Sequence, residues 1–144
     1  MANDRNIPKP RMLVVDDQVG IVSFLYDFFT QKGYDVRQAT SGNDAIRIVK
    51  KDPPNFVLLD VKLGWGKDGI QVLKSIKEVA PDVRVIMMTS VSDEDIIEEA
   101  FKLGADDYII KPFSLKYLEK VVMLKVLNLA IKNIGKHEDE KKPE

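Results

Sequence analysis

Strand-like and helix-like segments alternate along the chain. The strand-like segments, either fully apolar or alternating, lie at 12–15, 34–39, 56–59, 83–88 and 108–110. Between and after them, apolar residues recur at spacings of three and four. This spacing predicts a helix that ends at Gly33, one over 41–50, one before Pro81, one from Ser92 to Gly104 and one from Ser114 to about Ile134. Such an alternation predicts an α/β fold, with a parallel sheet covered by helices on both faces.

The two ends of the chain lack this periodicity. Residues 1–10 are polar and contain two prolines, which predicts a disordered lead-in, and residues 135–144 form a charged tail that we expect to be solvated and disordered. The folded domain is therefore expected over 11–126, with 127–134 as an extension of the last helix. A chain of 144 residues has room for one such domain.

Composition and charge exclude several classes of function. The net charge of −1 argues against a general nucleic-acid surface, so we expect no direct binding of nucleic acid. The absence of cysteine excludes thiol chemistry, and the single histidine, His137, lies in the charged tail, which argues against Ser-His triads and His-based metal sites. No apolar run approaches 18 residues and no hydrophobic signal segment opens the chain, so a cytoplasmic protein without a membrane segment is expected.

Unusual polar residues follow four of the five predicted strands directly. Asp16 and Asp17 follow the first strand, Asp60 the third, Thr89 the fourth and Lys111 the fifth. Ligands of open parallel sheets bind beyond the carboxyl ends of the strands. In a five-stranded sheet of order 2-1-3-4-5, these four strands are neighbours, and their polar residues would converge at one edge.

The chemistry of such a cluster points to a cation and a phosphoryl group. Clustered carboxylates resist joint ionisation unless a cation neutralises them. Oxygen ligands without His or Cys favour Mg²⁺, which binds one or two carboxylates and keeps several waters. A lysine opposite the metal would suit a dianionic phosphoryl group, and an aspartate can itself be the nucleophile that forms an acyl phosphate.

The residues that carry these features resemble one known family. Val14-Val15-Asp16-Asp17, the lone Asp60 after an apolar strand, Met88-Thr89-Ser90 and the segment 105–113 (ADDYIIKPF) are similar to the receiver domains of response regulators in bacterial two-component signalling systems. The resemblance covers about residues 10–126. It implies the flavodoxin-like fold of chemotaxis regulators: a doubly wound, five-stranded parallel sheet of order 2-1-3-4-5 in a three-layer sandwich.

The resemblance also implies a role for each site residue. Asp60 would accept a phosphoryl group from a sensor histidine kinase, a phosphotransfer protein or a small donor such as acetyl phosphate. Mg²⁺ would be held by the carboxylates of Asp16, Asp17 and Asp60 and by the backbone carbonyl of Lys62. The chain would catalyse its own phosphorylation and dephosphorylation and would not be a turnover enzyme on an external substrate.

Three further residues would read or transmit the phosphorylation. Thr89 would hydrogen-bond the phosphoryl oxygens, and Lys111 would pair with them. Tyr108 would move inward with Thr89 and so change the face made by the fourth helix, the fifth strand and the fifth helix, which an unidentified downstream protein would recognise. The bond between Lys111 and Pro112 would be cis.

One loop departs from the family pattern. Gly64 stands where the family usually has a proline, and the stretch before Asp68-Gly69 contains an apparent extra residue. We expect Trp65 to be exposed on this loop. The metal and phosphoryl positions are unaffected by the departure.

Each site residue also has a structural explanation when it is taken alone. Asp16 and Asp17 could cap the following helix, Asp60 could belong to a turn, Tyr108 could be core, and Lys111 could be an ordinary solvated lysine.

Two other functions also place polar groups beyond parallel strands. They are a Mg²⁺-dependent phosphatase with an aspartyl nucleophile and a flavodoxin-like electron carrier.

The last predicted helix is apolar nearly all round. Nine of the eleven residues from Val121 to Ile131 are apolar, and only Lys125 and Asn128 interrupt them. One apolar stripe, expected to face the sheet, is formed by Leu115, Leu118, Val122, Val126 and Leu129. A second stripe is formed by Leu124, Leu127, Ile131 and Ile134. The second stripe either packs back on its own domain or, as we expect, forms a homodimer with its copy.

Overall fold

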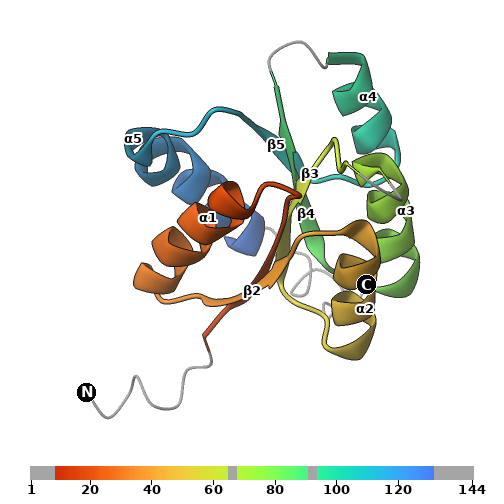
Figure 1. Ribbon diagram of the computed structural model, residues 1–144, viewed down its shortest axis with the longest axis horizontal. Coiled ribbons are helices and arrows are strands. Elements are labelled where there is room, and N and C mark those ends of the chain that lie inside the picture. Colours follow the sequence, from red (N-terminus) through yellow and green to blue (C-terminus); the bar gives the residue numbers. More distant parts are fainter. Residues whose placement is uncertain (1–8, 65–67, 91–93, 132–144) are drawn as a thin grey trace, which may run out of the picture.

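The computed structural model describes residues 9–64, 68–90 and 94–131 (Figure 1). The strands are β1 (Arg11–Val15), β2 (Asp35–Ala39), β3 (Phe56–Asp60), β4 (Arg84–Thr89) and β5 (Asp107–Ile110). The helices are α1 (Val19–Gln31), α2 (Gly42–Lys51), α3 (Gly69–Val79), α4 (Glu94–Lys102) and α5 (Leu115–Tyr117), which continues as the π-helical segment η2 (Leu118–Val122). The alternation predicted from the sequence is confirmed.

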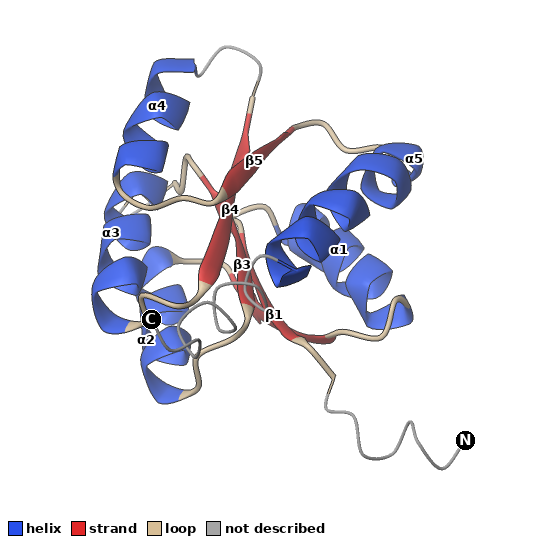
Figure 2. Ribbon diagram, turned by 180° about the vertical axis from the view of Figure 1, so that it is seen from behind, coloured by secondary structure: helices blue, strands red, loops and turns tan. Residues whose placement is uncertain are grey.

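The strands form one parallel sheet in the order β2-β1-β3-β4-β5. Helix α1 and the last helix cover one face of this sheet, and α2, α3 and α4 cover the other, as the two opposite views show (Figures 1 and 2). The predicted three-layer, doubly wound fold is therefore confirmed. All five strands run the same way, so their carboxyl ends meet at one edge of the sheet, at the top in Figure 1.

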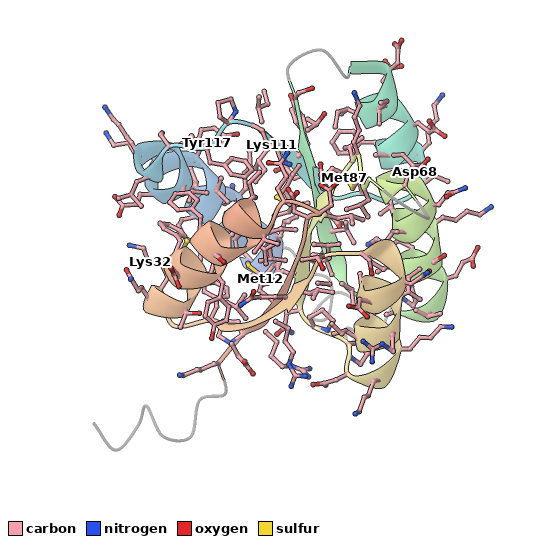
Figure 3. All side chains as sticks on the ribbon, in the orientation of Figure 1. Met12, Lys32, Asp68, Met87, Lys111 and Tyr117 are labelled. Carbon is pink, nitrogen blue, oxygen red and sulfur yellow. The ribbon has the colours of Figure 1, made fainter. Side chains whose placement is uncertain are left out.

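Side-chain alternation along the strands divides the core between the two faces. Met12 and Val14 of β1 pack on the side of α1 and the last helix, whereas Leu13 and Val15 pack on the side of α2 and α3. In β4, Met87 lies on the opposite face from Met12, and both side chains are labelled in Figure 3. Both faces of the central strands are buried, which explains why these strands are apolar except at their ends, where Arg11, Asp60, Arg84 and Thr89 lie.

Local signals in the sequence set the helix boundaries. Gly33 follows the end of α1 with a φ of 94°, a left-handed conformation that glycine adopts without steric cost. Ser41 and Ser114 cap α2 and α5 by accepting a hydrogen bond from a backbone N–H three residues on. The expectations for Ser92 and Trp65 lie outside the described residues, as do residues 1–8 of the lead-in and all of the tail.

The last helix continues from η2 through residues 123–131. Four of the five residues assigned to the sheet-facing stripe are buried: Leu118, Val122, Val126 and Leu129. The assignment of Leu115 to that stripe is wrong, because its side chain lies in the first turn, outside the contact with the sheet, and is 55% exposed. Among the described helices, none is both long and apolar enough to cross a membrane.

The second stripe of the last helix does not pack back on its own domain. Leu124, Leu127 and Ile131 are each more than half exposed. Ile134, the fourth member, lies outside the described residues. The packing-back alternative is therefore wrong for these three side chains.

The two stripes predict opposite responses to truncation. Leu118→Ala should lower the free energy of unfolding by about 3 kcal/mol, because it leaves a cavity between the helix and the sheet. Leu124→Ala, its matched control on the exposed face, should change the same quantity by less than about 0.5 kcal/mol in the monomer. Urea unfolding at low protein concentration measures both, and equal losses would contradict this assignment of the two faces.

Candidate functional site

Four neighbouring strands deliver the predicted polar residues to one edge of the sheet. Asp16 and Asp17 follow β1 directly, Asp60 is the last residue of β3, Thr89 is the last residue of β4, and Lys111 follows β5. Strand pairing continues up to this edge, since the N–H of Lys111 donates to the carbonyl of Thr89 at 2.7 Å. The structure therefore brings these polar residues together at one edge of the sheet, as the strand order predicted.

The three aspartates form a compact acidic cluster. One carboxylate oxygen from each of Asp16, Asp17 and Asp60 lies within 4.8 Å of the others. Asp16 and Asp60 are buried, whereas Asp17 is exposed. The alternative that Asp16 and Asp17 cap α1 is wrong, because Gln18 is the N-cap residue and the Asp16 carboxylate accepts the N–H of Gln18 at 2.9 Å.

Lys111 is the cationic partner of this cluster. Its Nζ lies 2.5 Å from Oδ2 of Asp16 and 3.4 Å from Oδ2 of Asp60, and its side chain is only 17% exposed. The alternative of an ordinary solvated lysine is therefore wrong. Lys111 lies at the upper end of the sheet in Figure 3, and the peptide bond that joins it to Pro112 is cis, as expected.

The surroundings of Asp60 raise the pKa of its carboxyl group to about 6. Burial is the largest cause, because it disfavours the charged form, and the neighbouring carboxylate of Asp16 adds to it. Lys111 and the backbone N–H of Lys62, which donates to Oδ1 of Asp60 at 3.3 Å, oppose this rise in pKa. One ammonium group thus does not compensate fully for two adjacent carboxylates.

A cleft of about 370 Å³ opens above the cluster. The residues that line it include Asp17, Asp60, Lys62, Gly64, Thr89 and Lys111. Gly64 closes one side, and a Cβ atom at this position would lie 2.7 Å from Oδ2 of Asp17. A side chain at residue 64 would therefore displace the Asp17 carboxylate. The backbone of this unusual loop is part of the cleft wall.

The donor set fits a hard divalent cation. Three carboxylates offer oxygen ligands at close range, and the exposed position of Asp17 leaves room for water. Burial and the adjacent Asp16 carboxylate raise the pKa of Asp60, and a cation bound here would favour its charged form. Thiolate ligands are excluded, since the chain has no cysteine.

Tyr108 lies on β5 and is not among the described residues that line the cleft. It pairs with Met87 in the sheet, whereas Thr89 pairs with Ile110. Its ring is half-buried and meets the ring of Phe101 edge-on, with 6.2 Å between the centroids. Tyr108 is thus neither fully buried core nor free in solvent.

Sequence reasoning missed two groups of paired charges. At the opposite end of the sheet, the Asp106 carboxylate accepts hydrogen bonds from Lys77 Nζ at 3.1 Å and from an Arg84 guanidinium nitrogen at 2.9 Å. In the second group, Lys125 Nζ donates to Oδ1 of Asp107, the first residue of β5, at 2.8 Å. The only sequence signal for the second group was the position of Lys125 within an apolar run.

Comparison with known proteins identifies the family. The family model of the response regulator receiver domain matches residues 12–123, so the chain belongs to that family. Receiver domains are the signal-accepting parts of two-component systems, and the assignment favours such a role over the phosphatase and electron-carrier alternatives.

Similar proteins differ in length. The chain is 41% identical over 112 residues to Sporulation initiation phosphotransferase F of Bacillus subtilis, a match that covers 78% of this chain and 90% of that protein. It is 40% identical over 111 residues to Probable transcriptional regulator ycf27 of Porphyridium aerugineum, covering 77% of this chain but only 45% of that protein.

Solved structures agree with the fold. The receiver domain of NtrX from Brucella abortus is 30% identical, with a TM-score of 0.72, and the match covers 79% of this chain and 96% of that one. A longer NtrX structure from the same organism has a TM-score of 0.83 at 26% identity, covering 95% of this chain and 32% of that one.

The raised pKa of Asp60 predicts a pH-dependent stability in the absence of divalent cations. The pKa of its carboxyl group is about 6 in the folded protein, against an ordinary value of 3.8, so the folded protein binds this proton more tightly. Protonation of Asp60 therefore stabilises the folded state. This stabilisation is complete below the ordinary pKa and is lost as the pH rises through about 6. Asp60→Asn should be more stable than the wild type by about 2–3 kcal/mol at pH 7, since one pKa unit corresponds to about 1.4 kcal/mol.

Denaturant unfolding in EDTA, repeated between pH 4 and pH 7, measures this difference. The advantage of Asp60→Asn should shrink toward pH 4, where the wild-type carboxyl group is protonated in the folded state. A difference that is independent of pH would contradict the assignment of the raised pKa to Asp60.

Proposed function

We propose that this chain is a phosphorylation-activated receiver in which Asp60 accepts a phosphoryl group in a Mg²⁺-dependent reaction. The observation that carries the proposal is the position of Asp60 in an open cleft, where it forms an acidic cluster with Asp16 and Asp17 and lies 3.4 Å from the ammonium group of Lys111. Family membership supports it, because five motif residues of the resemblance, Asp17, Asp60, Thr89, Ser90 and Lys111, line this cleft.

The acidic cluster, Lys62 and Lys111 each have a part in the proposed transfer. An oxygen of Asp60 attacks the phosphorus of a phosphohistidine, the P–N bond breaks, and the released imidazole nitrogen takes a proton. Asp16, Asp17, Asp60 and the backbone carbonyl of Lys62 would hold Mg²⁺, which would supply positive charge to the phosphoryl oxygens. Lys111 exchanges its contact with Asp16 for one with the incoming phosphoryl oxygens.

Thr89 and Tyr108 would convert this chemistry into a signal. The buried Thr89 lies at the end of β4 in the cleft wall, where its hydroxyl is suited to hydrogen-bond the new phosphoryl oxygens. Tyr108, on the neighbouring strand, would move with it and alter the face formed by α4, β5 and the last helix. The switch requires that the two states make different contacts.

The partners follow from this reaction. The donor would be a sensor histidine kinase or a phosphotransfer protein of the cytoplasm, and the output an as yet unidentified protein that recognises the altered face. We propose no direct contact with nucleic acid or a membrane. The chain would catalyse its own phosphorylation and dephosphorylation and would turn over no external substrate.

The central test is the mass of the protein after incubation with acetyl phosphate. The wild type with Mg²⁺ should gain one phosphoryl group, and EDTA should prevent the gain. Asp60→Asn should gain none, because an amide cannot form the acyl phosphate. The matched control is Asp82→Asn, an exposed carboxylate that precedes β4 at the other end of the sheet, and it should behave as the wild type does. Undiminished phosphorylation of Asp60→Asn would remove Asp60 as the acceptor.

We also propose that the exposed stripe of Leu124, Leu127 and Ile131 pairs with its copy in a homodimer. These side chains are spaced by three and four residues, which places them on one side of the helix, and water contact is unfavourable for all three. A two-fold axis would bring each stripe against its copy.

Light scattering over a range of concentrations tests the dimer. The double variant Leu127→Glu with Ile131→Glu should be a monomer that still accepts a phosphoryl group, because it spares the stripe that faces the sheet. Lys74→Glu, an exposed change on α3 at the other face of the sheet, should dimerise as the wild type does. A wild type that remains monomeric at every concentration would end this proposal.

A further inference from the structure

Lys125 is the charged residue that interrupts the apolar run of the last helix, and it does not extend freely into water. Its side chain is 26% exposed, and its Nζ donates to Oδ1 of Asp107 at 2.8 Å. The same Nζ lies 5.2 Å from the centroid of the Tyr108 ring, within the range of a cation–π contact. Both partners are adjacent residues at the start of β5.

The Tyr108 ring is held from two directions. Lys125 reaches it from the last helix on one side of the sheet, and Phe101 meets it edge-on from α4, which lies on the other side. This arrangement is possible because β5 is the edge strand of the sheet. The ring of one half-buried tyrosine is thus contacted by both helices that flank this edge.

Asp107 fixes the position from which Lys125 acts. Its Oδ1 accepts both the ammonium group of Lys125 and the backbone N–H of Tyr108, the latter at 2.8 Å. The ion pair therefore holds the ammonium group of Lys125 beside β5. The cation–π contact, in contrast, depends on where the Tyr108 ring lies, and it weakens when the ring moves away.

We infer that Lys125 is a positioning residue for Tyr108, and that it favours the ring position of the unphosphorylated protein. The inference rests on the proposed function, in which Tyr108 moves after Asp60 is phosphorylated. A contact made in only one of two states shifts the population toward that state. Lys125 therefore opposes activation, and by reciprocity the movement of Tyr108 loosens the attachment of the last helix to β5.

The test measures the affinity for beryllofluoride, a mimic of the phosphoryl group, by calorimetry on the full chain with Mg²⁺. Lys125→Met keeps most of the aliphatic stem and removes the charge. It should tighten binding about threefold, the factor expected when one partly exposed cation–π contact in the competing state is lost. Lys120→Met, the matched control at an exposed position of the same helix, should leave the affinity unchanged.

A double-mutant cycle separates the positioning role from a purely structural one. In a Tyr108→Leu background, Lys125→Met should have no further effect, because the ring on which Lys125 acts is absent. Lys125→Arg, which retains a cation able to pair with Asp107 and stack on the ring, should restore the wild-type affinity. NMR shifts of the Tyr108 ring in the free protein should change in Lys125→Met and not in Lys120→Met.

Two results would overturn the inference. The first is an unchanged beryllofluoride affinity in Lys125→Met. The second is a threefold effect that persists at full size in the Tyr108→Leu background, since Lys125 would then act through Asp107 or the helix alone. A wild type that binds no beryllofluoride would instead reject the proposed function. The two failures are therefore distinguishable.

Discussion

Two buried carboxylates facing a single ammonium group are the constraint on which the site depends. Asp16 and Asp60 are both buried, and Lys111 contacts both through one Nζ. Burial, together with the neighbouring carboxylate of Asp16, raises the pKa of Asp60 to about 6, so the folded protein bears a cost for keeping this group charged. The rest of the domain, a dry sheet covered on both faces, provides the free energy that offsets this cost.

The fold was predictable because its signals are local and redundant. Gly33, Ser41 and Ser114 mark helix boundaries through backbone conformation or capping, and each acts within a few residues of itself. The strand order followed from the resemblance and from polar residues at strand ends. Parallel strands place those ends together irrespective of the distances between them in sequence.

Contacts that depend on side-chain direction could not be predicted in the same way. Leu115 fits the spacing of the buried stripe, yet it is exposed, because the first turn of the helix lies beyond the sheet. The sequence likewise indicated that Lys125 and Asp107 are charged, but their pairing depends on the direction in which the last helix crosses β5. Periodicity assigns a residue to one side of a helix and does not identify its neighbour.

The last helix has features of both kinds: an apolar periodicity that the sequence predicts and side-chain contacts that it does not. Its buried stripe anchors it to the sheet, its exposed stripe is available to a second chain, and Lys125 lies between them with Tyr108 as its contact. The π-helical segment η2 precedes Lys125 and sets the rotation of the turns that follow it. A movement of the Tyr108 ring would therefore change the contacts of the same helix that carries the exposed stripe. The proposed phosphorylation at Asp60 and the proposed association through the last helix would then be coupled by physical contact, without requiring any rearrangement of the sheet.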